Sequence, residues 1–128
     1  MGKKILVVDD DSIIAKIIDM SLSRRGHEVT VFHSGVDAVT HIFAERPDSV
    51  VLDIRLPDCD GWFIAKLLEK AEGPEKVPVI VTSVLEPDHR KVDEHRPYAY
   101  IQKPFDMGQL VEAVEGSLSG DLSPPGGS

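Results

Sequence analysis

Short apolar runs and segments of helical period follow one another five times along the chain. Five runs have the length and residue types of strands, and they cover residues 5–8, 28–32, 49–54, 77–82 and 98–102. The third run is apolar enough to be buried on both faces, whereas the second alternates apolar and polar residues as an edge strand does. The pattern predicts five strands, each followed by a helix.

The helices are predicted from apolar residues at three- and four-residue spacing. In residues 12–25 these are Ile14, Ile17, Ile18 and Leu22. Asp11 or Ser12 can cap the start of this helix, and Gly26 can end it. The second helix, which stops before Pro47, has the apolar residues Val36, Val39 and Phe43. The third, residues 62–70, has Ile64, Leu67 and Leu68. The last, residues 106–118, has Met107, Leu110, Val111, Val114 and Leu118. The fourth helix, residues 87–94, is short and highly charged, with Val92 as its only large aliphatic residue.

Polar residues stand where four of the five strands end. Asp9 and Asp10 follow the first strand, Asp53 ends the third, Thr82 the fourth, and Lys103 follows the fifth. The second strand contributes no such residue. Alternating strands and helices predict a doubly wound parallel sheet with right-handed crossovers and helices on both faces. The distribution of polar ends fits the flavodoxin-like strand order 2-1-3-4-5.

Because the carboxyl ends of parallel strands form one crevice, these polar side chains are expected to meet. Three neighbouring carboxylates raise one another's pKa and destabilise an empty site. Hard oxygen ligands of this kind suit Mg²⁺. Asp9, Asp10 and Asp53 therefore predict a magnesium site, whereas Asp11 is explained by the positive end of a helix.

Asp53 is the candidate nucleophile of this crevice, because a carboxylate can attack phosphorus and form an acyl phosphate. Positioning and charge neutralisation then do most of the catalysis. The Thr82 hydroxyl can donate to one phosphoryl oxygen, and the Lys103 ammonium can neutralise another. A carboxylate phosphorylated with the help of a metal ion is the chemistry that this set predicts.

Composition narrows the class of protein. The chain has 128 residues, a net charge of −8 and a single cysteine, Cys59. The negative charge argues against a direct nucleic-acid surface, and the single cysteine excludes an internal disulfide. No apolar run is long enough to span a bilayer, and the run after Lys3 and Lys4 is too short for a signal peptide. We expect a cytoplasmic protein that does not bind membranes, with one domain over residues 1–119 and a flexible tail or linker stub over 120–128.

Four motifs resemble the receiver domain of two-component response regulators, over essentially residues 3–118. They are Asp9-Asp10, Asp53-Ile54-Arg55-Leu56-Pro57-Asp58-Cys59-Asp60-Gly61, Thr82-Ser83 and Lys103-Pro104-Phe105. The Asp-x-x-Leu-Pro-x-x-Asp-Gly and Lys-Pro-Phe strings are each fairly specific, and their combination with the acidic pair is very specific.

The resemblance implies that Asp53 accepts a phosphoryl group from a histidine kinase or a histidine phosphotransfer protein. It implies that Asp10, Asp53 and the backbone carbonyl of Arg55 bind Mg²⁺, with Asp9 reaching the ion through water. Thr82 and Tyr100 would be the switch that alters the face of the fourth helix, fifth strand and last helix. This phosphoprotein would signal to a downstream output domain or protein, as a monomer or a phosphorylation-dependent homodimer. Beyond self-phosphotransfer and auto-dephosphorylation, no enzyme activity is implied.

Three departures from the family pattern modify these expectations. Residues 94–99 replace a usual Gly-Ala pair, and the helix before them has little to anchor it. We therefore expect residues 87–97 to be short or mobile and the output face to be atypical. Arg55 and Val84 occupy positions that vary in the family. Arg55 could cover the phosphoryl group and slow hydrolysis, or it could be solvated.

Other functions compete with a signalling switch. An aspartate-nucleophile phosphohydrolase usually has a second carboxylate two residues after the nucleophile, where this chain has Arg55. A flavin- or nucleotide-binding relative needs a Gly/Ser/Thr-rich cradle after the first strand, where the three aspartates would repel phosphate. A non-phosphorylated docking receiver would not need the complete polar set.

Three residue types are expected to be structural. Cys59 is interpreted as an ordinary loop residue and Trp62 as packing at the start of its helix. The five histidines show no metal-ligand spacing and are expected at the surface.

Overall fold

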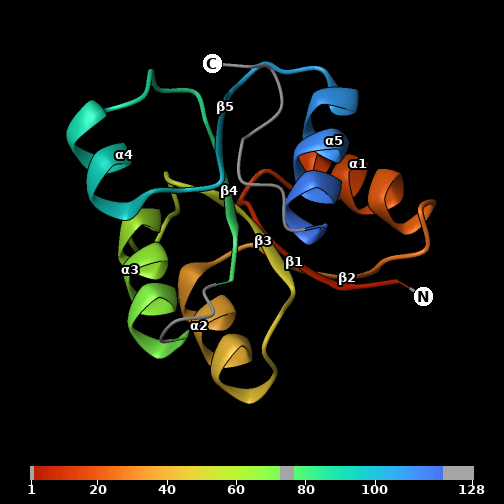
Figure 1. Ribbon diagram of the computed structural model, residues 1–128, viewed down its shortest axis with the longest axis horizontal. Coiled ribbons are helices and arrows are strands. Elements are labelled where there is room, and N and C mark those ends of the chain that lie inside the picture. Colours follow the sequence, from red (N-terminus) through yellow and green to blue (C-terminus); the bar gives the residue numbers. More distant parts are fainter. Residues whose placement is uncertain (1, 73–76, 120–128) are drawn as a thin grey trace.

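The computed structural model describes residues 2–72 and 77–119, and the expected tail at 120–128 lies outside them. Within this part, strands and helices alternate as the sequence predicts (Figure 1). The strands are β1 (Lys4–Val8), β2 (Glu28–Phe32), β3 (Ser49–Asp53), β4 (Val79–Ser83) and β5 (Ala99–Gln102). The helices are α1 (Ser12–Ser23), α2 (Gly35–Ala44), α3 (Gly61–Glu72), α4 (His89–His95) and α5 (Met107–Leu118).

The strands form a single parallel sheet in the order β2-β1-β3-β4-β5, which confirms the predicted flavodoxin-like topology. β2 is an edge strand, as predicted, and β3 is buried along its whole length. The registers bring Asp53 beside Thr82 and Ser83 beside Gln102. The carboxyl ends of the strands therefore lie at one edge of the sheet.

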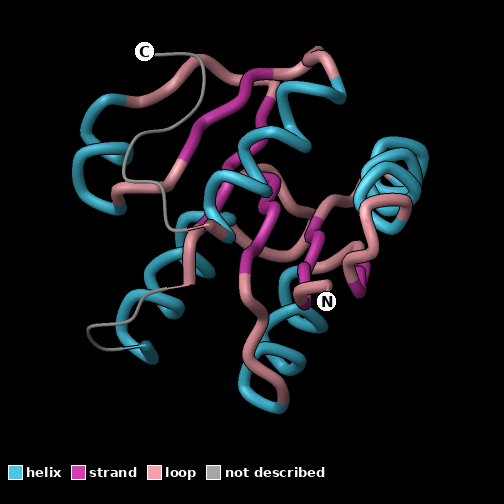
Figure 2. Tube along the Cα trace, turned by 45° about the vertical axis from the view of Figure 1, so that its right-hand side comes forward, coloured by secondary structure: helices cyan, strands magenta, loops and turns pink. Residues whose placement is uncertain are grey.

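Helices cover both faces of the sheet (Figures 1 and 2). α1 and α5 pack on one face, against the buried side chains Ile5, Val7, Val51, Ile80 and Ile101. α2 and α3 pack on the other face, against Leu6, Val8, Val50, Leu52 and Val81. Alternate residues of each strand thus enter different cores, as the twofold period of a strand requires.

At the carboxyl edge, carboxylates accept hydrogen bonds from the first N–H groups of α1 and α2. Asp11 accepts hydrogen bonds from the backbone N–H groups of Ile13 and Ile14, which confirms its predicted role as N-cap. Asp58, from the loop after β3, accepts from the N–H groups of Gly35 and Val36. These two bonds hold the pKa of Asp58 below its usual range. At the other end of α1, Gly26 has a φ of 87°, a conformation that favours glycine and ends the helix.

Two predicted apolar faces are partly wrong. Ile17 is 46% exposed, and α1 buries Ala15 with Ile18 and Leu22 instead. On α2, the predicted residues Val36 and Phe43 are 63% and 68% exposed, whereas Ala38 and Ile42 are buried. Both helices carry apolar residues on more than one side. Periodicity alone therefore does not choose the face that packs on the sheet.

α4 is a single short helix of seven residues, which confirms the expectation that this segment is short. Its C-cap is Arg96, whose φ of 47° is left-handed, and Pro97 follows. Most of α4 is weakly anchored, as expected, but the expectation missed one buried contact. His95, the last residue of α4, is buried against Trp62 and hydrogen-bonded to Glu69 of α3. His95 is also a correction to the expectation that the histidines lie at the surface.

Candidate functional site at the carboxyl edge of the sheet

Four predicted site residues continue the same face of the sheet. Asp9, Asp53, Thr82 and Lys103 each lie two residues beyond a side chain in the core between the sheet and α1 and α5. Those core side chains are Val7, Val51, Ile80 and Ile101. The twofold period of the strands therefore directs all four polar side chains to the side where α1 and α5 lie.

The three aspartates meet as the sequence predicts. Asp9, Asp10 and Asp53 each offer one carboxylate oxygen, and these oxygens lie within 4.8 Å of one another. Asp9 is 1% and Asp53 5% exposed, whereas Asp10 is exposed at the mouth of an open pocket that Arg55 and Lys103 also line. Close carboxylate oxygens open to solvent on one side fit a Mg²⁺ ion that keeps several waters. The arrangement can therefore hold such an ion.

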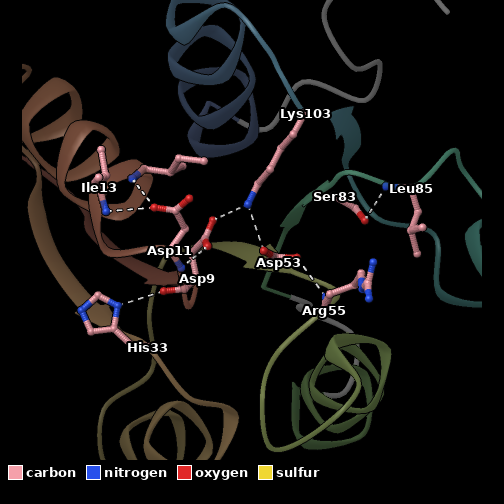
Figure 3. A network of polar contacts seen from close by, with 10 residues as sticks. Asp9, Asp11, Ile13, His33, Asp53, Arg55, Ser83, Leu85 and Lys103 are labelled. Atoms are coloured by element: carbon pink, nitrogen blue, oxygen red, sulfur yellow. Dashed lines mark hydrogen bonds and ion pairs between the residues drawn. The ribbon is translucent and has the colours of Figure 1, made fainter.

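Lys103 joins the two buried carboxylates (Figure 3). Its Nζ donates to Asp9 Oδ2 at 2.8 Å and to Asp53 Oδ2 at 2.9 Å. Its backbone N–H donates to the Ser83 carbonyl, and its peptide bond to Pro104 is cis. Lys103, which follows β5, thus places its ammonium at the ends of β1 and β3.

The electrostatics reflect two carboxylates that share one ammonium. Burial opposes the charge of Lys103, but its hydrogen bonds to Asp9 and Asp53 outweigh this effect and raise the pKa of Lys103. Burial raises the pKa of Asp9, and the bonds from Lys103 and the Asp11 backbone reduce this increase without reversing it. Three carboxylates in this cluster face the ammonium of Lys103. The site is short of positive charge.

Asp53 is held by backbone as well as by Lys103. Its Oδ1 accepts from the Arg55 N–H at 2.9 Å, and the Gly61 N–H donates to the Ile54 carbonyl. A Cβ on Gly61 would lie 2.5 Å from the Asp53 carbonyl oxygen. Only glycine permits α3 to start so close to Asp53. The Asp-Gly pair in the motif thus fixes the backbone around the candidate nucleophile.

Thr82 has an unsatisfied hydroxyl. It is fully buried, and its Oγ1 has no hydrogen-bond partner among the described residues. A buried hydroxyl without a partner costs free energy, so each such group in a native protein calls for an explanation. Thr82 is the register partner of Asp53 on the adjacent strand. Its hydroxyl is therefore available to a ligand bound at Asp53.

Tyr100 lies on the opposite face of the sheet. Its side chain is half-buried in the core beneath α2 and α3, and its ring lies 6.4 Å from that of Trp62. Its hydroxyl donates to the Leu85 carbonyl at 2.9 Å, in the loop between β4 and α4. The structure thus links Tyr100 to the loop that follows Thr82, but it does not bring the two side chains into one cluster.

His33 is a site residue that sequence reasoning missed. It follows β2, and its Nδ1 donates to the Asp9 carbonyl at 2.9 Å (Figure 3). The Phe32 carbonyl accepts from the Asp9 N–H at 3.1 Å. The second strand was predicted to contribute no polar residue to this edge; His33, directly after β2, is such a residue, and it holds the backbone of Asp9. A lone histidine after an edge strand carries no sequence signal for this role.

Cys59 and Trp62 agree with their structural interpretation. Cys59 is half-buried, and burial, followed by the charges of Asp58 and Asp60, raises the pKa of its thiol. Trp62 is buried at the start of α3. Neither side chain belongs to the acidic cluster.

The sequence matches the family described as response regulator receiver domain over residues 5–115. The chain belongs to this family. The flavodoxin-like topology and the polar carboxyl edge described above are thus those of a receiver of two-component signalling. Receiver domains are in general signalling domains rather than enzymes. In the described part of the chain, no helix has the length and apolarity to cross a membrane.

Solved structures of receivers have the same fold. The BeF₃-activated receiver domain of DrrB is 33% identical, with a TM-score of 0.82 over 93% of this chain and 99% of that one. A Francisella response regulator receiver domain is 30% identical, with a TM-score of 0.82 over 92% and 98%. The DrrB response regulator of Thermotoga maritima, an OmpR/PhoB homolog, is 34% identical, with a TM-score of 0.81. This chain covers 54% of its length.

Proposed function

We propose that this receiver domain is a phosphorylation-dependent switch whose phosphoacceptor is Asp53. The donor is a histidine kinase or a histidine phosphotransfer protein, and the reaction requires Mg²⁺. Family membership and the acidic cluster support this proposal. The observation that carries it is the surroundings of Asp53, which combine an ammonium, a backbone N–H and an unpartnered hydroxyl on the adjacent strand.

The reaction transfers one phosphoryl group between two proteins. One carboxylate oxygen of Asp53 attacks phosphorus, the P–N bond of the phosphohistidine breaks, and its electron pair remains on the donor imidazole. Lys103 neutralises charge on one phosphoryl oxygen, and Thr82 donates its hydroxyl to another. A Mg²⁺ ion held by Asp10, Asp53 and the Arg55 carbonyl, with Asp9 behind a water, would supply further charge neutralisation.

Transmission of the signal uses Thr82 and Tyr100. A phosphoryl group at Asp53 gives the Thr82 hydroxyl the partner that it lacks and shifts the population towards a second arrangement of β4 and its loop. Tyr100 responds because its hydroxyl is bonded to that loop. The change reaches the surface of α4, β5 and α5, where an output domain or a separate protein reads it.

The cellular setting follows from this assignment. We infer a cytoplasmic protein whose partners are the phosphodonor and the output component, with no direct nucleic-acid contact and no membrane. Phosphorylation either leaves it a monomer or drives formation of a homodimer. The similarity to part of an OmpR/PhoB homolog supports an output component like that of such response regulators.

The test uses a small phosphodonor and a phosphoryl mimic. Wild-type protein with Mg²⁺ and acetyl phosphate should gain the mass of one phosphoryl group, and beryllofluoride with Mg²⁺ should perturb the Trp62 fluorescence. Asp53→Asn should show neither response, whereas Asp93→Asn, at an exposed position of α4, should behave as wild type. Phosphorylation of Asp53→Asn to the wild-type level, or a wild-type protein inert to both reagents, would overturn the proposal.

A further inference from the structure

His95 is a buried histidine that the proposed phosphotransfer does not use. It is the last residue of α4, and its side chain is 4% exposed. Its ring stacks on the Trp62 indole, with centroids 5.2 Å apart and planes inclined by 16°. In Figure 1, α4 lies beside α3, away from α1 and α5. The imidazole therefore lies between the two helices rather than in solvent.

Two carboxylates orient the His95 ring. Its Nδ1 donates to Glu69 Oε2 of α3 at 3.0 Å, and its Nε2 lies 3.5 Å from Glu94 Oε2 of α4 itself. A stacked ring with an acceptor at each nitrogen has one favourable orientation, because turning it breaks either the stack or the hydrogen bond. His95 is thus a specific connection between α3 and α4.

Trp62 extends this connection to the sheet. Its ring stacks with that of His95 and with that of Tyr100, at centroid distances of 5.2 and 6.4 Å, and its plane is inclined by 27° to Tyr100. Trp62 also follows Gly61, the residue whose Cα approaches the Asp53 backbone too closely for a side chain. The three rings of His95, Trp62 and Tyr100 thus connect α4 to β5.

We propose that His95 is a positioning residue of the switch, which acts through Trp62 on Tyr100. His95 holds the Trp62 indole in place. A change in the position of the Tyr100 ring therefore changes how α4 packs on α3, and the reverse. This inference rests on the proposed function, because it assigns the route by which Tyr100 reaches α4.

The composition of α4 explains why one histidine has this influence. The helix has seven residues, and apart from the buried His95 only Val92 packs on the core cluster as a partly buried aliphatic residue. A helix this short has little stability of its own and depends on tertiary contacts. Loss of the stacked ring therefore removes a large share of what holds α4 on α3.

The test separates the ring from the hydrogen bond. His95→Phe keeps a flat ring over Trp62, whereas His95→Asn keeps a donor at the position of Nδ1 for Glu69 but removes the ring. His89→Ala, at the exposed first residue of the same helix, is the matched control. Amide hydrogen exchange of residues 90–94 and Trp62 fluorescence are measured for each protein, with and without Mg²⁺ and beryllofluoride.

In wild type, His89→Ala and His95→Phe, beryllofluoride should change both the exchange of residues 90–94 and the Trp62 emission. In His95→Asn these amides should exchange about tenfold faster without the mimic, because one aromatic contact is lost. Adding the mimic should leave the exchange of this variant unchanged, although binding of the mimic persists. A merely structural role would destabilise the variant but preserve the response of α4.

Two outcomes distinguish the failures. If wild type does not respond to Mg²⁺ and beryllofluoride, the proposed function fails. If wild type responds and the amides of His95→Asn respond to the same extent, the positioning role of His95 is overturned while the proposed function stands.

Discussion

Charged side chains at the two edges of the sheet differ in burial and in pairing. At the amino edge, Lys4 pairs with Glu45, and their side chains are 51% and 46% exposed. Glu115 of α5 accepts from Arg25 at 3.0 Å and from His27 at 3.2 Å. Each of these groups has an ionic or hydrogen-bonding partner. Most of their side chains are exposed to solvent.

At the carboxyl edge, Asp9, Asp53 and Lys103 are largely buried, and the charges do not balance. Asp9 and Asp53 share the single ammonium of Lys103, Asp10 adds a third carboxylate, and the Thr82 hydroxyl has no partner among the described residues. Natural proteins rarely leave buried polar groups incomplete, and those that remain cluster at functional sites. The comparison teaches that these ionic groups of the amino edge find partners within the folded chain, whereas the described carboxyl edge leaves polar groups to which a ligand can bind.

The largest effect is expected where the shortage of positive charge is greatest. Lys103→Met leaves the buried carboxylates of Asp9 and Asp53 facing each other. Removing one partner of a buried ion pair is strongly destabilising, and because this pocket is open on one side we expect a loss of about 2 kcal/mol in the free energy of unfolding. Urea denaturation at pH 7 without Mg²⁺ measures it. Lys16→Met, at an exposed position of α1, is the control, and equal stability of the two variants would contradict the imbalance.

Adding the missing positive charge should stabilise the protein. A ligand that binds only the folded state at ten times its dissociation constant raises the free energy of unfolding by about 1.4 kcal/mol. We expect this increase for Mg²⁺ with wild type and its near-complete loss in Asp10→Asn. Thermal denaturation at matched ionic strength measures both. A similar rise with Na⁺ alone would indicate ordinary screening rather than a site.

A smaller effect is expected at His33, which holds the Asp9 carbonyl from β2. Loss of one hydrogen bond in His33→Ala should raise the Mg²⁺ dissociation constant about two- to tenfold. His33→Asn should restore most of the affinity, because its amide N–H can replace Nδ1–H. Isothermal titration calorimetry measures the affinity, with His89→Ala as the control. Equal affinities in all four proteins would remove His33 from the site.

The smallest effect is expected at the amino edge, with Glu45→Gln. The hydrogen bond from Lys4 lowers the pKa of Glu45, so the ionised form is favoured in the folded state. Any stabilisation is present at neutral pH and is lost as the pH falls through the folded-state pKa. The variant should therefore differ only slightly from wild type in its urea midpoint at pH 7, and the difference should vanish in acid. A loss as large as that of Lys103→Met would erase the contrast between the edges.

The strand order and most of the acidic site were predictable because they depend on local patterns. Strand runs and their polar ends are visible in the sequence, and a parallel sheet necessarily brings those ends together. Asp9, Asp10, Asp53 and Lys103 therefore meet as predicted. The packing faces of α1 and α2 were not predictable, since Ile17 and Phe43 are as apolar as the residues that are buried.

The sequence by itself determined the topology of this receiver domain and the chemistry along one edge of its sheet, because both follow from the period of apolar residues and from the residue type at each strand end. Only the tertiary structure decided which polar groups lack partners, that His33 holds the Asp9 backbone, and that His95 anchors α4 through Trp62. These contacts join residues from different elements. Their existence depends on how helices and loops pack, which no local pattern specifies.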